Sequence, residues 1–120
     1  MGEDRREHPR LEFRSEVKVE PPAQAPFTAW AINVSKGGVC LSSAHQLRSA
    51  EKVRLWFQLG EAEAFALSAS VRYATRVTTQ IDGEDTGGYY VVGVMFDELQ
   101  AHERQRLDLL LEVAAADDEP

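Results

Sequence analysis

The chain has 120 residues, of which 43% are hydrophobic and 28% charged, and this fits one globular domain with a single core. Its net charge of −7 argues against general binding to DNA or RNA, because domains that hold a nucleic-acid polymer are normally basic. A small anionic ligand is not excluded, since four basic side chains fall close together, at Arg5, Arg6, Arg10 and Arg14.

The sequence contains few features that would direct the protein to a membrane or make a side chain chemically reactive. No apolar run is long enough to span a bilayer, and the first residues contain no hydrophobic signal region, so we expect a cytoplasmic protein without membrane insertion. The single cysteine, Cys40, lies between Val39 and Leu41 and is interpreted as a small strand residue. We expect no metal site, because the three histidines have no partner at ligand spacing, and no enzymatic activity, because Ser35 has no nearby histidine and acid.

Alternating apolar and polar residues predict β-strands from Leu11 onward. The first extends to Val19, and Pro21 and Pro22 end it. The further strands are predicted over 27–35, from 39 to 41, and over 53–59, 65–73 and 89–96. An acidic, glycine-rich loop is expected at 82–88.

The C-terminal part changes to a helical period. Its apolar residues are spaced i, i+3, i+4 and i+7, at Leu107, Leu110, Leu111 and Ala114. Asp97 or Gln100 is expected to cap the start of this helix. The fold class is therefore predicted to be mainly β, a small closed antiparallel barrel of six strands with one C-terminal helix packed beside it. We expect residues 11–115 to form this domain and 116–120 to form an acidic tail that frays.

Two motifs point to a ligand site. Arg5, Arg6 and Arg10 supply guanidinium groups, which suit phosphates and flat bases. The second motif is Asn33-Val34-Ser35-Lys36-Gly37-Gly38, an amide, a hydroxyl and a flexible turn at the end of a strand. If Trp30, Ile32 and Val34 fill the core, period-two geometry points Asn33 and Ser35 outward. Trp56 is out of phase with its strand's core positions, and we favour a place under the helix over a partner surface.

These motifs, in this order and spacing, resemble the PilZ domain, a bacterial receptor for the second messenger cyclic di-GMP. Two further landmarks support the resemblance: Val71-Arg72-Tyr73 is similar to the family's Val-x-aromatic strand, and Gly93-Val94-Met95-Phe96 to its Gly-Val-x-Phe strand. The resemblance covers roughly residues 5 to 113 and implies a PilZ-type barrel.

The resemblance also implies roles for single residues. Arg6 and Arg10 match the family's Arg-x-x-x-Arg element, which pairs with phosphate and stacks on guanine. Asn33 and Ser35 are implied to contact one guanine, and Gly37 or Gly38 to let the backbone turn sharply beside the ligand. Arg5 resembles the arginine of members that take up an intercalated pair of ligand molecules. No cofactor is expected besides this ligand.

We therefore expect a signalling receptor or adaptor. Residues 1–10 are expected to be mobile without ligand and to order against the barrel when cyclic di-GMP binds. This change would alter contacts with an effector protein in motility, pili, exopolysaccharide production or transcription, and the protein would be a monomer or a weak homodimer. The alternative is a PilZ-like structural adaptor that does not bind the nucleotide and acts through protein contacts in a motility or polarity complex.

Overall fold

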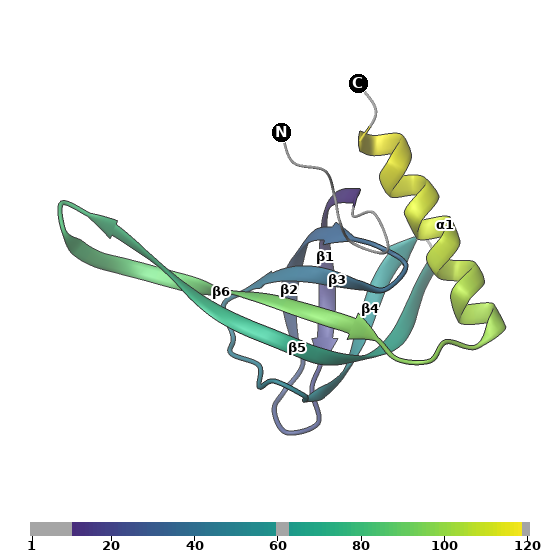
Figure 1. Cartoon of the computed structure of the whole chain (residues 1–120), viewed down its shortest axis with the longest axis horizontal. Coiled ribbons are helices and arrows are strands. Elements are labelled where there is room, and N and C mark those ends of the chain that lie inside the picture. Colours follow the sequence, from purple (N-terminus) through teal and green to yellow (C-terminus); the bar gives the residue numbers. More distant parts are fainter. Residues whose placement is uncertain (1–10, 60–62, 119–120) are drawn as a thin grey trace.

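The computed structural model describes residues 11–59 and 63–118, which form a six-stranded barrel and one helix (Figure 1). The elements are β1 Leu11–Glu20, β2 Phe27–Val34, β3 Gly38–Ser43, β4 Lys52–Leu59, β5 Glu63–Ile81, β6 Glu84–Phe96 and α1 Ala101–Asp118. All neighbouring strands are antiparallel, and the order β1-β2-β3-β6-β5-β4 closes through the pairing of β1 with β4. The predicted fold class is confirmed.

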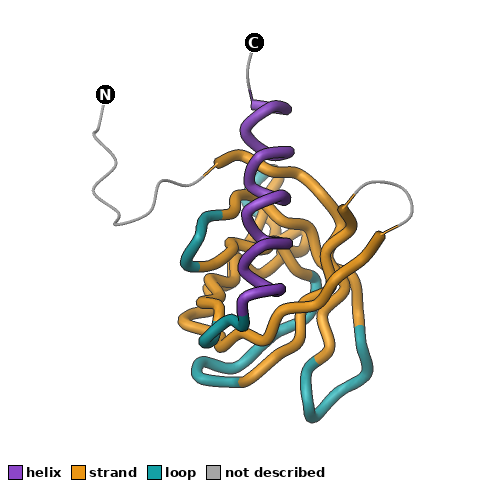
Figure 2. The backbone as a smooth tube through the Cα atoms, turned by 90° about the vertical axis from the view of Figure 1, so that its right-hand side faces the viewer, coloured by secondary structure: helices purple, strands orange, loops and turns teal. Residues whose placement is uncertain are grey.

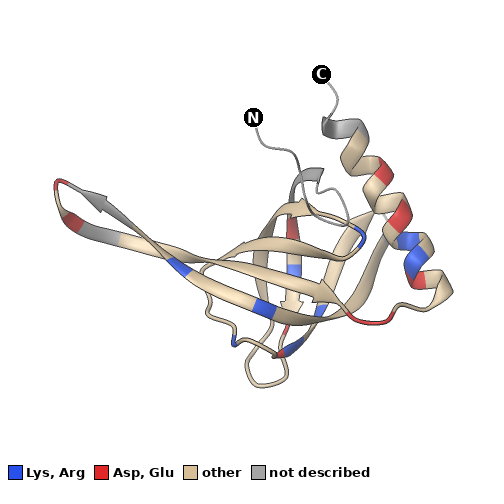
Figure 3. Ribbon diagram, viewed as in Figure 1, with Lys and Arg blue, Asp and Glu red and all other residues tan. Residues whose placement is uncertain are grey.

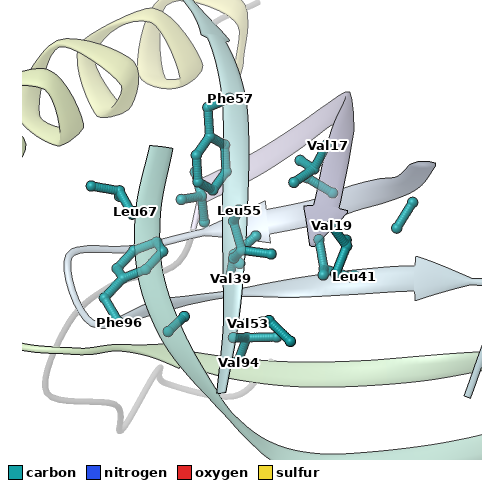
Figure 4. Packing of buried hydrophobic residues seen from close by; sticks show 14 of the residues in the cluster. Val17, Val19, Val39, Leu41, Val53, Leu55, Phe57, Leu67, Val94 and Phe96 are labelled. Atoms are coloured by element: carbon teal, nitrogen blue, oxygen red, sulfur yellow. The ribbon is translucent and has the colours of Figure 1, made fainter. Parts of the chain in front are cut away.

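The core fills the inside of the barrel with alternate residues from every strand (Figure 4). In β4 these are Val53, Leu55 and Phe57, as the alternation predicted. The ring of Phe57 stacks on Phe65 and meets Phe96 edge to face, with centroids 5.6 and 6.2 Å apart. Close packing of this kind fixes the register of each strand, because a slip of one residue would turn its apolar set toward water.

The helix α1 runs along one side of the barrel (Figure 2). It packs mainly on β1. Leu107, Leu110 and Ala114 are fully buried, so the predicted apolar stripe is confirmed. The helix begins after Gln100, whose backbone N–H donates to Glu103 Oε1 at 2.8 Å, the reciprocal half of a capping box. It continues to Asp118 and so includes the first three residues of the segment expected to be a tail.

The hairpin of β5 and β6 is longer than predicted and extends away from the barrel (Figure 1). The expected loop at 82–88 is wrong, because only Asp82 and Gly83 form the turn and β6 begins at Glu84. Both turn residues have positive φ, 55° and 81°, the conformation of a two-residue hairpin turn whose twist matches the strands. Since β3 pairs with β6 only as far as Tyr90, the outer part of the hairpin has two strands.

Candidate functional site

The start of β1 lies beside the end of β2. Leu11 pairs with Val34, and Glu12 pairs with Asn33. Arg5, Arg6 and Arg10, the predicted arginine element, lie outside the described residues. Leu11 is the residue that follows Arg10, so the strand that continues the arginine element starts next to the Asn33–Gly38 turn. The backbone register therefore places Leu11, the first described residue, beside the end of β2 and the turn that follows it.

A β-bulge in β2 changes which side chains face the core. Ala31 pairs with Leu41 while Asn33 pairs with Cys40, so β2 has one more residue than β3 over this stretch. Ala29 and Ala31 are buried before the bulge, and Val34 is buried after it. The expectation that Trp30 and Ile32 fill the core with Val34 is wrong, since their side chains are 53% and 37% exposed. Simple alternation fails because the extra residue shifts the phase of the strand.

Ser35 does not point outward as predicted. It is 5% exposed, and its hydroxyl oxygen accepts a hydrogen bond from the Gly37 backbone N–H at 3.2 Å. The same hydroxyl donates to the Gly38 carbonyl at 3.4 Å, while the Ser35 N–H donates to that carbonyl at 2.8 Å. The side chain therefore shapes the turn from inside. Asn33, by contrast, is half-buried at the strand end before the turn.

The glycines of the turn allow it to lie against β6. A Cβ on Gly38 would come 2.1 Å from the carbonyl oxygen of Val94, so only glycine fits this position without a backbone shift. The Gly37 carbonyl accepts a hydrogen bond from the Phe96 N–H at 2.9 Å. Close approach and hydrogen bonding together fix the turn rigidly to the barrel wall.

The pairing of the strands brings the later landmarks to the same part of the barrel. One row of paired residues crosses four strands, namely Asn33, Cys40, Gly93 and Tyr73. The Tyr73 ring lies over Gly93, where an added Cβ would be 2.5 Å from its carbons. By simple alternation Tyr73 would share the buried face of Val71, but a register shift after Val71 leaves it 41% exposed. Its aromatic ring is thus a candidate site residue that the alternation pattern did not reveal.

Two basic side chains border the turn. Lys36 is exposed within it, and Arg72 is exposed with Nη1 3.6 Å from the sulfur of Met95, the residue paired with Gly38. The other described lysines and arginines are spread over several strands, a loop and the helix (Figure 3). Among the described residues, no group of three or more histidine, cysteine or acidic side chains could hold a metal ion. Two described cations, Lys36 and Arg72, therefore lie near the turn.

The chain belongs to the PilZ family, because the family's PilZ domain model matches residues 4–112. No curated protein matches the chain in sequence. Across the part of the chain that the structure describes, no helix has the length and apolarity that crossing a membrane requires.

Solved structures show the same fold. The PilZ domain with c-di-GMP of YcgR from Escherichia coli is 11% identical, with a TM-score of 0.76 over 95% of this chain and 94% of the other. The K. pneumonia MrkH–c-di-GMP complex is 18% identical (TM-score 0.72, 95% and 54%). The Bacillus subtilis inhibitor of motility, MotI/DgrA, is 19% identical (TM-score 0.69, 98% and 54%). The chain therefore spans about half the length of MrkH and MotI.

Proposed function

We propose that this protein is a cytoplasmic receptor for cyclic di-GMP and that the nucleotide binds between the arginine element and the Asn33–Gly38 turn. The observation that carries this proposal is the pairing of Leu11 with Val34, by which β1, the strand that follows Arg10 in the sequence, starts beside the turn. Membership of the PilZ family and the fold shared with c-di-GMP complexes of YcgR and MrkH support it. Its role is that of a receptor and not of an enzyme.

The residues of the proposed site have different roles in binding. Arg6 and Arg10 pair with phosphate and stack on guanine, since guanidinium offers a planar fork of donors that stays charged. Asn33 supplies an amide with both donor and acceptor groups at the strand end. Ser35, Gly37 and Gly38 act through the shape of the turn, because the serine side chain is buried within it.

Tyr73 extends the site along the paired row. Its half-exposed ring lies on the same row as Asn33, held against Gly93. An exposed aromatic ring stacks on a base with a gain of roughly 1–3 kcal/mol. We therefore include Tyr73 among the residues that contact the nucleotide.

Signalling follows from the same geometry. Binding of cyclic di-GMP orders residues 1–10 against the barrel, and the new surface changes contacts with an effector protein in motility, pili, exopolysaccharide production or transcription. Hydrogen exchange of residues 3–12 should slow when ligand saturates the protein, and unchanged exchange would contradict this switch.

Isothermal titration calorimetry with cyclic di-GMP tests binding. Arg10→Ala should weaken binding tenfold or more, because a charge-assisted hydrogen bond contributes roughly 1.5–3 kcal/mol. Arg104→Ala, which removes an exposed arginine from the helix, is the matched control and should bind like the parent. No heat from the parent protein at micromolar concentration would favour the nucleotide-independent adaptor.

The same titration measures stoichiometry. If Arg5 holds an intercalated pair, the parent protein should take two ligands per chain, and Arg5→Ala should reduce this ratio to one. A parent ratio of one would contradict the paired-ligand role of Arg5 and leave the receptor proposal intact.

A further inference from the structure

The outer wall of the barrel carries a groove of about 700 Å³ between Trp30 of β2 and Trp56 of β4. We call it the Trp30–Trp56 groove; Glu16 and Lys18 of β1 form its floor. The described residues that line it all come from strands, so the expectation that Trp56 lies under the helix is wrong. Both tryptophans of the chain are in this groove, and Trp30 is 53% exposed. Exposed tryptophan on the outer face of a barrel is characteristic of a surface that binds a partner.

The strand register sets the spacing of the two indoles. Glu16 pairs with Trp30 on one side of β1, and Lys18 pairs with Trp56 on the other side. With strands about 4.8 Å apart and a rise of about 3.4 Å per residue, the two tryptophan Cα atoms lie about 12 Å apart, diagonally across β1. The side chains between them are polar, so the groove has two aromatic walls and a polar floor.

One wall is fixed before any partner binds. The Trp56 indole N–H donates to the Glu20 carboxylate, and the Arg54 guanidinium lies 5.4 Å from the centroid of its ring. Trp30 lines the groove and has no hydrogen-bond or ring partner among the described residues, so its indole N–H is a donor without an acceptor there. A pre-positioned aromatic wall lowers the entropy lost on binding.

The backbone pairing excludes strand addition beside Trp56. Lys18 and Val19 of β1 pair with β2 on one side and with β4 on the other, so a partner cannot add a strand there. At this part of the groove a partner is recognised through side chains. The lining side chains include two donors, the Trp30 indole and the Lys18 ammonium, and one acceptor, the Glu16 carboxylate.

We propose that the Trp30–Trp56 groove binds an extended, proline-rich peptide segment of a partner protein. A polyproline II segment has no internal hydrogen bonds, so its carbonyl oxygens are available to the Trp30 and Lys18 donors, whereas a helix has its carbonyls already paired. Prolines three positions apart in such a segment lie about 9 Å apart, a spacing at which one proline can contact each indole. Glu16 selects a lysine or arginine next to the prolines.

This groove is separate from the nucleotide site but shares a strand with it. Residues 16 and 18 form its floor, and the same strand begins at Leu11 beside the turn. The inference depends on the proposed function in one respect only, which is that the proline-rich partner is the effector. Peptide binding itself requires no nucleotide.

Tryptophan fluorescence and calorimetry test the groove directly, since both tryptophans line it. The probes are acetylated peptides built on Ala-Arg-Pro-Leu-Pro-Ala-Leu-Pro, with arginine, leucine or glutamate before the first proline, and a control with alanine at every proline. We expect the arginine peptide to shift the emission and to bind most tightly. Trp30→Ala should weaken binding at least tenfold, whereas Leu109→Ala, which removes another exposed large apolar side chain, from the helix, should not change it.

Three results would overturn the proposal. The first is that no proline peptide binds at about 0.5 mM, and the second is that the alanine control binds equally well. The third is that the peptides leave the emission unchanged while another treatment shifts it. A shift with cellohexaose would indicate a carbohydrate site, and a shift on dilution of the protein alone would indicate self-association.

Titrations are run with and without cyclic di-GMP. Peptide binding without any nucleotide response would support the groove and count against the receptor, whereas nucleotide binding without peptide binding would do the reverse.

Discussion

The part of β2 before its bulge and the turn that follows β2 behave as opposite kinds of surface. Before the bulge, Trp30 is largely exposed and stands over an open groove. After it, Ser35 is buried, and its hydroxyl both accepts and donates a hydrogen bond within the turn. The strand thus exposes the Trp30 side chain before its bulge, whereas the turn after the strand buries the Ser35 side chain.

This difference separates binding from stability. Substitutions in the Ser35–Gly38 turn should destabilise the barrel and disturb the nucleotide site together, because the turn contributes shape. Substitutions in the Trp30–Trp56 groove should change partner binding with little effect on folding. Urea denaturation measured alongside each binding experiment therefore distinguishes the groove from the turn.

The largest effect is expected for Gly38→Ala. The new Cβ would meet the Val94 carbonyl oxygen at 2.1 Å, and because that atom belongs to the backbone of β6 the strand must shift. We expect a loss of about 2–4 kcal/mol in the free energy of unfolding, with loss of cyclic di-GMP binding.

Gly83→Ala is the control for this substitution. Gly83 needs glycine for its positive φ of 81°, but an added Cβ there would meet nothing within 4 Å. Its cost should be about 1 kcal/mol, with nucleotide binding unchanged. Equal losses for the two variants would show that close packing on β6 does not govern the turn.

Ser35→Ala should have the next largest effect. It removes the hydroxyl that accepts a hydrogen bond from the Gly37 N–H and donates one to the Gly38 carbonyl. Gly37 is half-buried and Gly38 is buried. We expect a loss of about 1–2 kcal/mol in the free energy of unfolding. Cyclic di-GMP binding, measured by calorimetry, should weaken because the turn loosens. Weaker binding with unchanged stability would instead indicate that the serine contacts the ligand directly.

The sequence predicted the barrel and the helix well, because both depend on apolar periodicity. The stripe of Leu107, Leu110 and Ala114 and the inward face of β4 follow directly from spacing. The sequence did not predict which side chains among Trp30, Ser35 and Tyr73 are buried and which are exposed, because each lies next to a bulge or turn. Bulges depend on pairing between strands distant in the sequence, and periodicity within one strand does not contain that information.

A smaller effect is expected for Gly93→Ala. The added Cβ would fall 2.5 Å from the Tyr73 ring, and a side chain can move where a backbone cannot. The stability loss should be within about 1 kcal/mol, but the displaced ring should weaken nucleotide binding. In a Tyr73→Ala background the same substitution should cost nothing, since Ala is favoured over Gly in a strand. A double-mutant cycle measures this coupling, and additive effects would show that the ring does not rest on Gly93.

The smallest effect on stability is expected for Trp30→Ala. With 53% of its side chain exposed and no hydrogen bond among the described residues, its loss should change the free energy of unfolding by about 0.5 kcal/mol or less. Trp56→Ala should cost more, about 1–2 kcal/mol, because it also removes the hydrogen bond to Glu20 and the Arg54 contact. Urea denaturation followed by circular dichroism compares the two variants. A large loss for Trp30→Ala would mean that its ring supports the barrel, and the part of β2 before the bulge would then resemble the Ser35–Gly38 turn.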